Sequence, residues 1–279
     1  MNSLPLDTLE ELKIRKELLI KCIKIEKPET AILERQSFAY LGKGSNLYNL
    51  SVLIKILDCK SEVKYILDQV KENIKLSIST SITPREQQGL QYALFIYSLL
   101  SGDREQTYES SIIIKKMGIT DARYVSSSEF FVILANLYLD NKDEVEKLLP
   151  KLTKLEEKKN EKYLKPGLTE AISGINTKNI NQFSSGLKKM IDGHIHETRY
   201  LKWALTTKHF VCEPAVILCS IALKNGIDVK PFIINSHVKL KTRTQFPANR
   251  TDLPSTKRFI VPVDLIPDYM LEPWRMHLV

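Results

Sequence analysis

Hydrophobic residues recur every three or four positions along most of the first 226 residues, which is the spacing of amphipathic α-helices. The pattern begins at the N-terminus, where Leu9, Leu12, Leu19 and Ile23 fall on one helical face. This stretch has early acidic residues and lacks the apolar run of a signal peptide. We therefore expect it to be part of the fold.

Local signals mark where several helices begin and end. Thr83, Pro84 and Glu86 form a capping box with proline at the first helical position, so the hydroxyl and the carboxylate can each accept an unpaired helix amide. Residues 126–129 read as a second capping box. Gly226 predicts a helix end, because glycine adopts the left-handed conformation without steric cost.

The helices are arranged in a repeating pattern. Four times, an apolar helix is followed by a short polar turn and then by an amphipathic helix. The turns begin at residues 58, 101, 140 and 176, so successive turns are 43, 39 and 36 residues apart. Helix-pair repeats have periods of ~34–47 residues, and stacking covers the apolar helix of each pair. The pattern predicts a mainly α fold, a solenoid-like bundle of stacked antiparallel helical hairpins over residues 1–226.

The pattern changes after Gly226. Residues 227–233 read as extended, and hydrophobic or Thr positions alternate with cationic or polar ones from Val238 to Phe246, which predicts a strand with one cationic face. Residues 258–261 are the expected partner strand. We predict that residues 227–279 form a small C-terminal β-hairpin or extended segment packed on the bundle, which makes the chain one structural domain overall.

Composition narrows the class of protein further. The chain has 10 glycines in 279 residues, about half the usual share, and β-sandwiches and barrels use glycine heavily in turns. The longest strongly apolar stretch, residues 90–100, is much shorter than the ~20 residues that a membrane-spanning helix needs. We therefore expect a helical protein that does not enter a membrane.

The cysteines indicate the compartment. Cys22, Cys59, Cys212 and Cys219 form no Cys-x-x-Cys pair, and most of them sit in apolar helical patterns. Cys212 and Cys219 are two helical turns apart, about 10 Å, which is too far for a disulfide. We interpret all four as reduced, buried thiols and predict a cytoplasmic protein.

The net charge is +8, from 41 Lys and Arg against 33 Asp and Glu. Lysine supplies 31 of the 41 positive charges, whereas nucleic-acid-binding proteins favour arginine for its bidentate contacts with phosphate and guanine. The charge therefore favours a solvated surface over nucleic-acid binding.

One segment, residues 237–258, has six cationic residues and a single Asp, a sum of +5. Two interpretations stay open: a sheet edge protected against aggregation by lysines, or a binding surface for an acidic partner. The expected partner-binding residues are Lys239, Lys241, Arg243, Arg250, Lys257 and Arg258.

The sequence contains only weak matches to metal-binding, phosphate-binding and catalytic motifs. His194 and His196 are two positions apart in a helical pattern, so they point to different sides and cannot share a metal ion. Residues 42–45 contain Gly-Lys-Gly-Ser but lack the spacing and the preceding strand of a phosphate-binding loop. No serine lies in a strained glycine elbow. We expect no catalytic residue, no cofactor and no metal ion, and hence no enzyme.

Two stretches of the chain together resemble a known family. The first combines an apolar helix, a polar turn and a second helix with a downstream His194, and the second is an apolar helix with a Gly-Ile-Asp-Val exit and a late proline-containing segment. The residues that carry this pattern are 168–172, 179–183, 186–190, 213–218, 222–229 and 266–271. This arrangement resembles the immunity protein 49 family, cytoplasmic antidotes to polymorphic bacterial toxins. The resemblance implies a helical protein that neutralises a toxin by binding it, without catalytic residues.

The leading hypothesis is therefore a non-enzymatic immunity protein that binds a cognate toxin domain in the cytoplasm. The alternative is a tetratricopeptide-like adaptor that holds a peptide along a concave face. A nucleic-acid-binding helical protein is a third hypothesis, motivated by the calculated isoelectric point of about 9.1.

Overall fold

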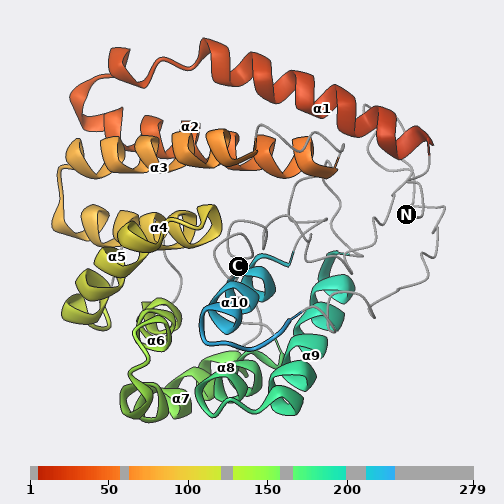
Figure 1. Ribbon diagram of the computed structural model, residues 1–279. Helices are drawn as coiled ribbons and strands as arrows, with labels where there is room; N and C mark the ends of the chain where they lie inside the picture. The colour runs from red at the N-terminus through yellow and green to blue at the C-terminus, as the bar shows by residue number, and fades with distance from the viewer. Residues whose placement is uncertain (1–5, 57–62, 121–127, 158–165, 199–211, 230–279) are drawn as a thin grey trace.

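The computed structural model describes residues 6–56, 63–120, 128–157, 166–198 and 212–229 (Figure 1). Helices account for most of these residues, and no strand occurs among them. The predicted mainly α class is thus confirmed. The elements are α1 (Leu6–Ile25), the 3-10 helix η1 (Pro28–Thr30), α2 (Leu33–Ile56), α3 (Val63–Ser79), α4 (Pro84–Ser101), α5 (Arg104–Met117), α6 (Ser128–Tyr138), α7 (Lys142–Glu156), α8 (Leu168–Asn176), α9 (Ile180–Thr198) and α10 (Glu213–Lys224).

Three of the predicted hairpin turns fall where the sequence places them. The turns at 101, 140 and 176 join α4 to α5, α6 to α7 and α8 to α9, and the helices of each hairpin pack against each other. Each turn has one residue at positive φ: Gly102 at 74°, Asp140 at 56° and Lys178 at 54°. The fourth predicted turn, at 58, lies outside the described residues, between α2 and α3.

The helix-end signals are also confirmed where the structure describes them. Thr83 Oγ1 accepts a hydrogen bond from the Glu86 amide at 3.2 Å, and the Glu86 carboxylate accepts one from the Ile82 amide at 3.3 Å. Gly226 takes φ of 81° after α10. The second capping box begins at residues outside the described ranges, and Ser128 Oγ accepts instead from the Thr120 amide at 3.1 Å.

Helix α10 lies inside the array formed by the other helices (Figure 1). It contacts α4, α6 and α8, the first helices of the three hairpins, and also α9. Every residue from Pro214 to Leu223 is buried. An α-helix that is apolar on all sides must be enclosed by protein, and here the three hairpins supply the enclosure. One continuous hydrophobic core therefore extends from Leu47 to Val229.

The α8–α9 hairpin is held by contact between backbones. A Cβ at Gly174 would lie 2.3 Å from the Phe183 amide nitrogen, and a Cβ at Gly186 would lie 2.3 Å from the Ala171 amide nitrogen. Side chains of any size would push the two helices apart at both positions. Glycine is therefore required there for the close approach of α8 and α9.

The predicted C-terminal β-hairpin or extended segment lies almost wholly outside the described residues. The described part of the 227–279 segment ends at Val229, which is fully buried in the core, as Ile227 largely is. The proposed boundary at residue 226 and the single-domain organisation remain predictions.

We predict that Gly174→Ala or Gly186→Ala lowers the free energy of unfolding by about 1–3 kcal/mol or more, since overpacking forces the backbone apart. Gly42→Ala is the matched control. A Cβ at Gly42, inside α2, would have no atom within 4 Å, so alanine should stabilise the protein by up to about 1 kcal/mol through helix propensity. Urea denaturation of the three variants checks this, and equal effects at the three positions would contradict it.

Candidate functional site

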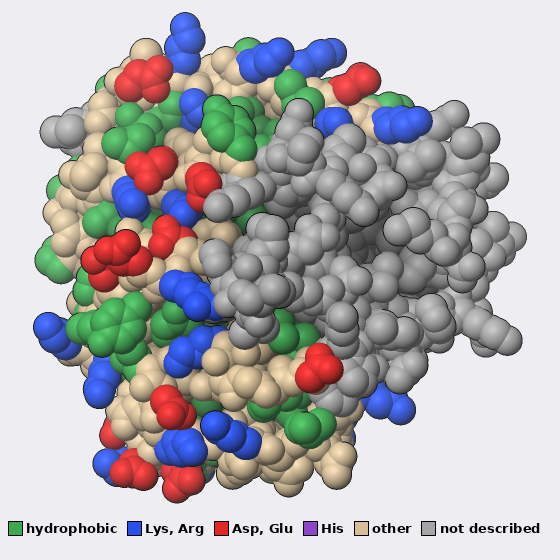
Figure 2. Space-filling view, viewed as in Figure 1, with side chains coloured by type: hydrophobic (Ala, Val, Ile, Leu, Met, Phe, Trp, Pro, Cys, Tyr) green, Lys and Arg blue, Asp and Glu red, His purple; other side chains and the backbone are tan. Residues whose placement is uncertain are grey.

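The six cationic residues singled out from the sequence, Lys239, Lys241, Arg243, Arg250, Lys257 and Arg258, lie outside the described residues. The structure therefore neither brings them together nor separates them. On the coloured part of the face seen in Figure 2, basic and acidic side chains lie side by side.

The described residues contain no cluster of three or more His, Cys, Asp and Glu side chains that could hold a metal ion. His194 and His196 are both within α9, as the helical pattern predicts. None of the helices in the described ranges has the length and apolar character required to cross a bilayer.

The cysteines only partly follow the prediction. Cys212 and Cys219 form no disulfide and are buried at the start and in the middle of α10, and burial raises the pKa of the Cys219 thiol far above its usual value. Cys22 is also free but is exposed, so its prediction as a buried thiol is wrong. The reason is that Cys22 lies on the side of α1 turned away from α2, whereas Ile23 packs on the core. Cys59 lies outside the described residues.

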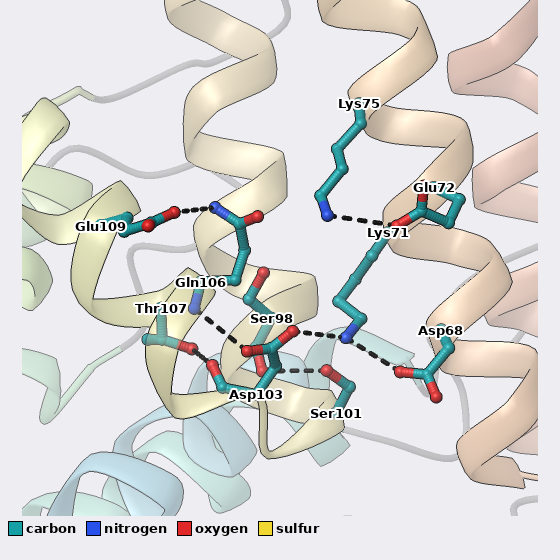
Figure 3. Close-up of polar contacts among 10 residues, drawn as sticks. All are labelled: Asp68, Lys71, Glu72, Lys75, Ser98, Ser101, Asp103, Gln106, Thr107 and Glu109. Carbon is teal, nitrogen blue, oxygen red and sulfur yellow. Dashed lines mark hydrogen bonds and ion pairs between the residues drawn. The ribbon is translucent and has the colours of Figure 1, made fainter.

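The strongest polar cluster joins α3 to the α4–α5 turn (Figure 3). Lys71, which is 7% exposed, places Nζ 2.7 Å from Asp103 Oδ2 and 2.9 Å from Asp68 Oδ1. Asp103 is also the N-cap of α5, because its Oδ1 accepts a hydrogen bond from the Gln106 amide at 3.0 Å. One carboxylate thus caps a helix and pairs with a buried ammonium group.

The electrostatics of this cluster fix its protonation. Burial lowers the pKa of Lys71, but hydrogen bonds to Asp103 and Asp68 and their negative charges outweigh burial, so the pKa lies above 10.5. Burial raises the pKa of Asp103, but hydrogen bonds from Lys71 and the Gln106 amide outweigh it, so the pKa lies below 3.8. At neutral pH Lys71 is protonated and held by two carboxylates. It has no free electron pair for base or nucleophile chemistry, and its role is to fasten α3 to the α4–α5 turn.

Two further polar contacts also join helices. Glu156, at the end of α7, accepts hydrogen bonds from the amides of Gly167 and Thr169 at 2.6 and 2.9 Å and so caps α8. Lys224, at the end of α10, donates to the Tyr138 carbonyl and lies 4.9 Å from the centre of that ring. Burial lowers the pKa of Lys224, although Asp140 opposes this. Both contacts satisfy helix ends and thus act in folding.

Helical spacing in the sequence places Lys71 on the core-facing side of its helix. Lys71 follows Leu67 and precedes Ile74 at helical spacing, and both of these neighbours are buried. A lysine on the core-facing side of a helix must find a charged partner. Helical spacing could identify Asp68, three positions earlier, as one partner. Asp103 is 32 positions away, so sequence spacing alone could not identify it.

Comparison of the chain with protein-family models, with curated proteins and with solved structures finds no match.

We predict that Asp103→Asn destabilises the protein by about 1–2 kcal/mol at neutral pH, since the amide can still cap α5 but loses the charged hydrogen bond to Lys71. The pKa of Asp103 is lower in the folded state than 3.8, so the stabilisation is present above pH 3.8 and is lost as pH falls through the folded-state pKa. The difference in the free energy of unfolding between wild type and variant should therefore disappear at acidic pH. Urea denaturation over a pH series measures it.

Asp68→Asn is the control for this prediction. Its carboxylate also pairs with Lys71, but its side chain is 46% exposed and lies inside α3 rather than at a helix end, so the loss at neutral pH should be clearly smaller. A difference for Asp103→Asn that stays constant from neutral to acidic pH would refute the assigned role of its charge.

Proposed function

We propose that this protein is an immunity protein of the immunity protein 49 type, a non-enzymatic inhibitor that binds a cognate bacterial toxin in the cytoplasm and thereby neutralises it. The observation that supports the proposal is that the resembling segments within residues 168–229 pack against one another, while residues 266–271 lie outside the described residues. Gly186 contacts Ala171, Phe183 contacts Gly174, and α10 packs on both α8 and α9. The resembling positions in α8, α9 and α10 thus help to build this part of the core.

The architecture supports inhibition by binding. The α8–α9 hairpin is locked by backbone contact, and α10 is enclosed by helices of all three hairpins. A scaffold held in this way loses little conformational entropy when it binds a partner. It can therefore cover a toxin surface with little entropic cost from ordering its own chain.

The position of α10 weighs against the adaptor alternative. A helical-repeat adaptor holds its peptide along the inner helices of successive repeats. In this chain α10 itself contacts α4, α6 and α8, so that the side on which a peptide would lie is occupied by the protein's own helix. We therefore favour a toxin that is bound on an outer surface.

The proposal predicts that a toxin domain is encoded next to this gene, and the test is rescue of cells from that domain. Co-expression of the full chain should restore growth, and the purified proteins should form a 1:1 complex by size-exclusion chromatography with light scattering. A toxin domain from an unrelated system is the control and should remain lethal. Equal killing by the neighbouring toxin with and without this protein would reject the proposal.

The cationic C-terminal residues yield a separate prediction. Reversing Lys239, Lys241 and Arg243 to Glu should slow association with an acidic partner tenfold or more at low salt, because electrostatic steering is lost. The melting temperature should change little, since exposed charges contribute little to folding. Stopped-flow binding measures the association rate. An unchanged rate would mean that these residues only protect a sheet edge.

A further inference from the structure

Helix α1 has hydrophobic residues on two sides. Leu19, Ile20 and Ile23 pack against the core, as expected for the side that contacts α2. On the other side, Ile14 is 57% exposed, Leu18 is 54% exposed and Ile25 is 76% exposed. A helix at the edge of a helical array ordinarily turns a polar face to water, so this second hydrophobic side indicates a surface that binds a partner.

The exposed hydrophobic residues form a line along the helix. Ile14, Leu18, Cys22 and Ile25 have spacings of four, four and three residues, and all four are exposed. At 100° per residue they fall within about 80° of arc, and at 1.5 Å per residue they span about 16 Å. We call these four residues the α1 stripe. A stripe of this spacing and length matches the contact line between two packed helices.

The border of the α1 stripe is basic. Lys13, Lys21 and Lys24 are exposed on one side of it, and Glu17 is the acidic residue among them from residue 13 onward, where the structure describes the side chains. The upper edge of the molecule, where α1 lies in Figure 1, shows basic side chains next to hydrophobic ones (Figure 2). A partner that matches this surface carries hydrophobic residues bordered by Asp or Glu.

We propose that the α1 stripe docks an acidic amphipathic helix of a partner protein. The inference rests on the proposed function for the identity of that partner, the toxin. The hydrophobic residues of the partner helix pack on Ile14, Leu18 and Ile25, and its carboxylates face Lys21 and Lys24. Charge thus sets the orientation and apolar contact supplies the affinity.

The basic border also favours an acidic partner helix over the other possible occupants of the α1 stripe. The chain's own residues 237–258 sum to +5, and a second copy would bring lysines against lysines, so both are repelled by the basic border. Helices that lie in a membrane interface have a broad apolar face, whereas the α1 stripe is narrow and has Glu17 beside Leu18. An acidic helix fits both the width and the charge.

The test uses the full chain and two synthetic amphipathic peptides of about 18 residues, with Leu at helical spacing and either Glu or Lys along the border. The Glu peptide should bind, the Lys peptide should not, and the binding should weaken steeply with salt. Ile14→Gln with Leu18→Gln should weaken Glu-peptide binding at least tenfold. Equal binding of the two peptides, or unchanged binding by the double variant, would overturn the inference.

Matched variants separate the surface from general effects. Ile180→Gln replaces an isoleucine that is 50% exposed at the start of α9, and it should bind the Glu peptide as wild type does. Lys21→Glu with Lys24→Glu should weaken binding as the hydrophobic pair does, whereas Lys151→Glu with Lys154→Glu on α7 should not. Circular dichroism confirms that each variant remains folded.

Three further measurements distinguish the occupants. Sedimentation of wild type as a dimer that Leu18→Gln dissociates, or co-sedimentation with equimolar phosphatidylcholine–phosphatidylserine vesicles that Leu18→Gln abolishes, would overturn the inference in favour of that occupant. With the neighbouring toxin as probe, a tenfold loss of affinity in the stripe variants supports it. Unchanged toxin affinity overturns it while the proposed function stands. If wild type forms no toxin complex, the proposed function fails and the peptide result alone decides the inference.

Discussion

Enclosure of α10 is the packing interaction that joins the first helices of the three hairpins, α4, α6 and α8, across the core. Its ten residues from Pro214 to Leu223 are buried, and they contact the first helix of each of three hairpins. Complete burial of one Val, Leu or Ile side chain is worth about 1.5–3 kcal/mol, so the burial of this helix contributes strongly to the stability of the helices that it contacts. Without it, α4, α6 and α8 would present hydrophobic faces to water.

Polar contacts determine how the helices are positioned within this apolar packing. Asp103 lies at the α4–α5 turn and Glu156 at the end of α7, and each joins a helix end to a neighbouring element through hydrogen bonds. Lys224 does the same between the end of α10 and the Tyr138 carbonyl. Hydrophobic burial is non-directional, whereas these bonds have defined geometry. They fix the register in which the hairpins and α10 meet.

Much of the helical order could be predicted from local sequence, because hydrophobic periodicity and turn residues act over a few positions. The turns at 101, 140 and 176 and the cap at Thr83 illustrate this. Contacts between distant residues could not be predicted: Lys71 pairs with Asp103 across 32 positions, and α10 meets α4 more than 100 positions earlier in the chain. The hydrophobic pattern also identified the packed side of α1. It did not show that hydrophobic residues on the opposite side of α1 are exposed, so Cys22 was wrongly predicted to be buried.

The late position of α10 in the chain has a consequence for synthesis. Ribosomes add about 5–20 residues per second, so α4, α6 and α8 leave the ribosome before residues 213–224 exist to cover them. During that interval the hydrophobic sides of the nascent hairpins are exposed to solvent, which favours chaperone binding and aggregation. The core can therefore be fully packed only after α10 has been synthesised, and the risk of aggregation is greatest before that point.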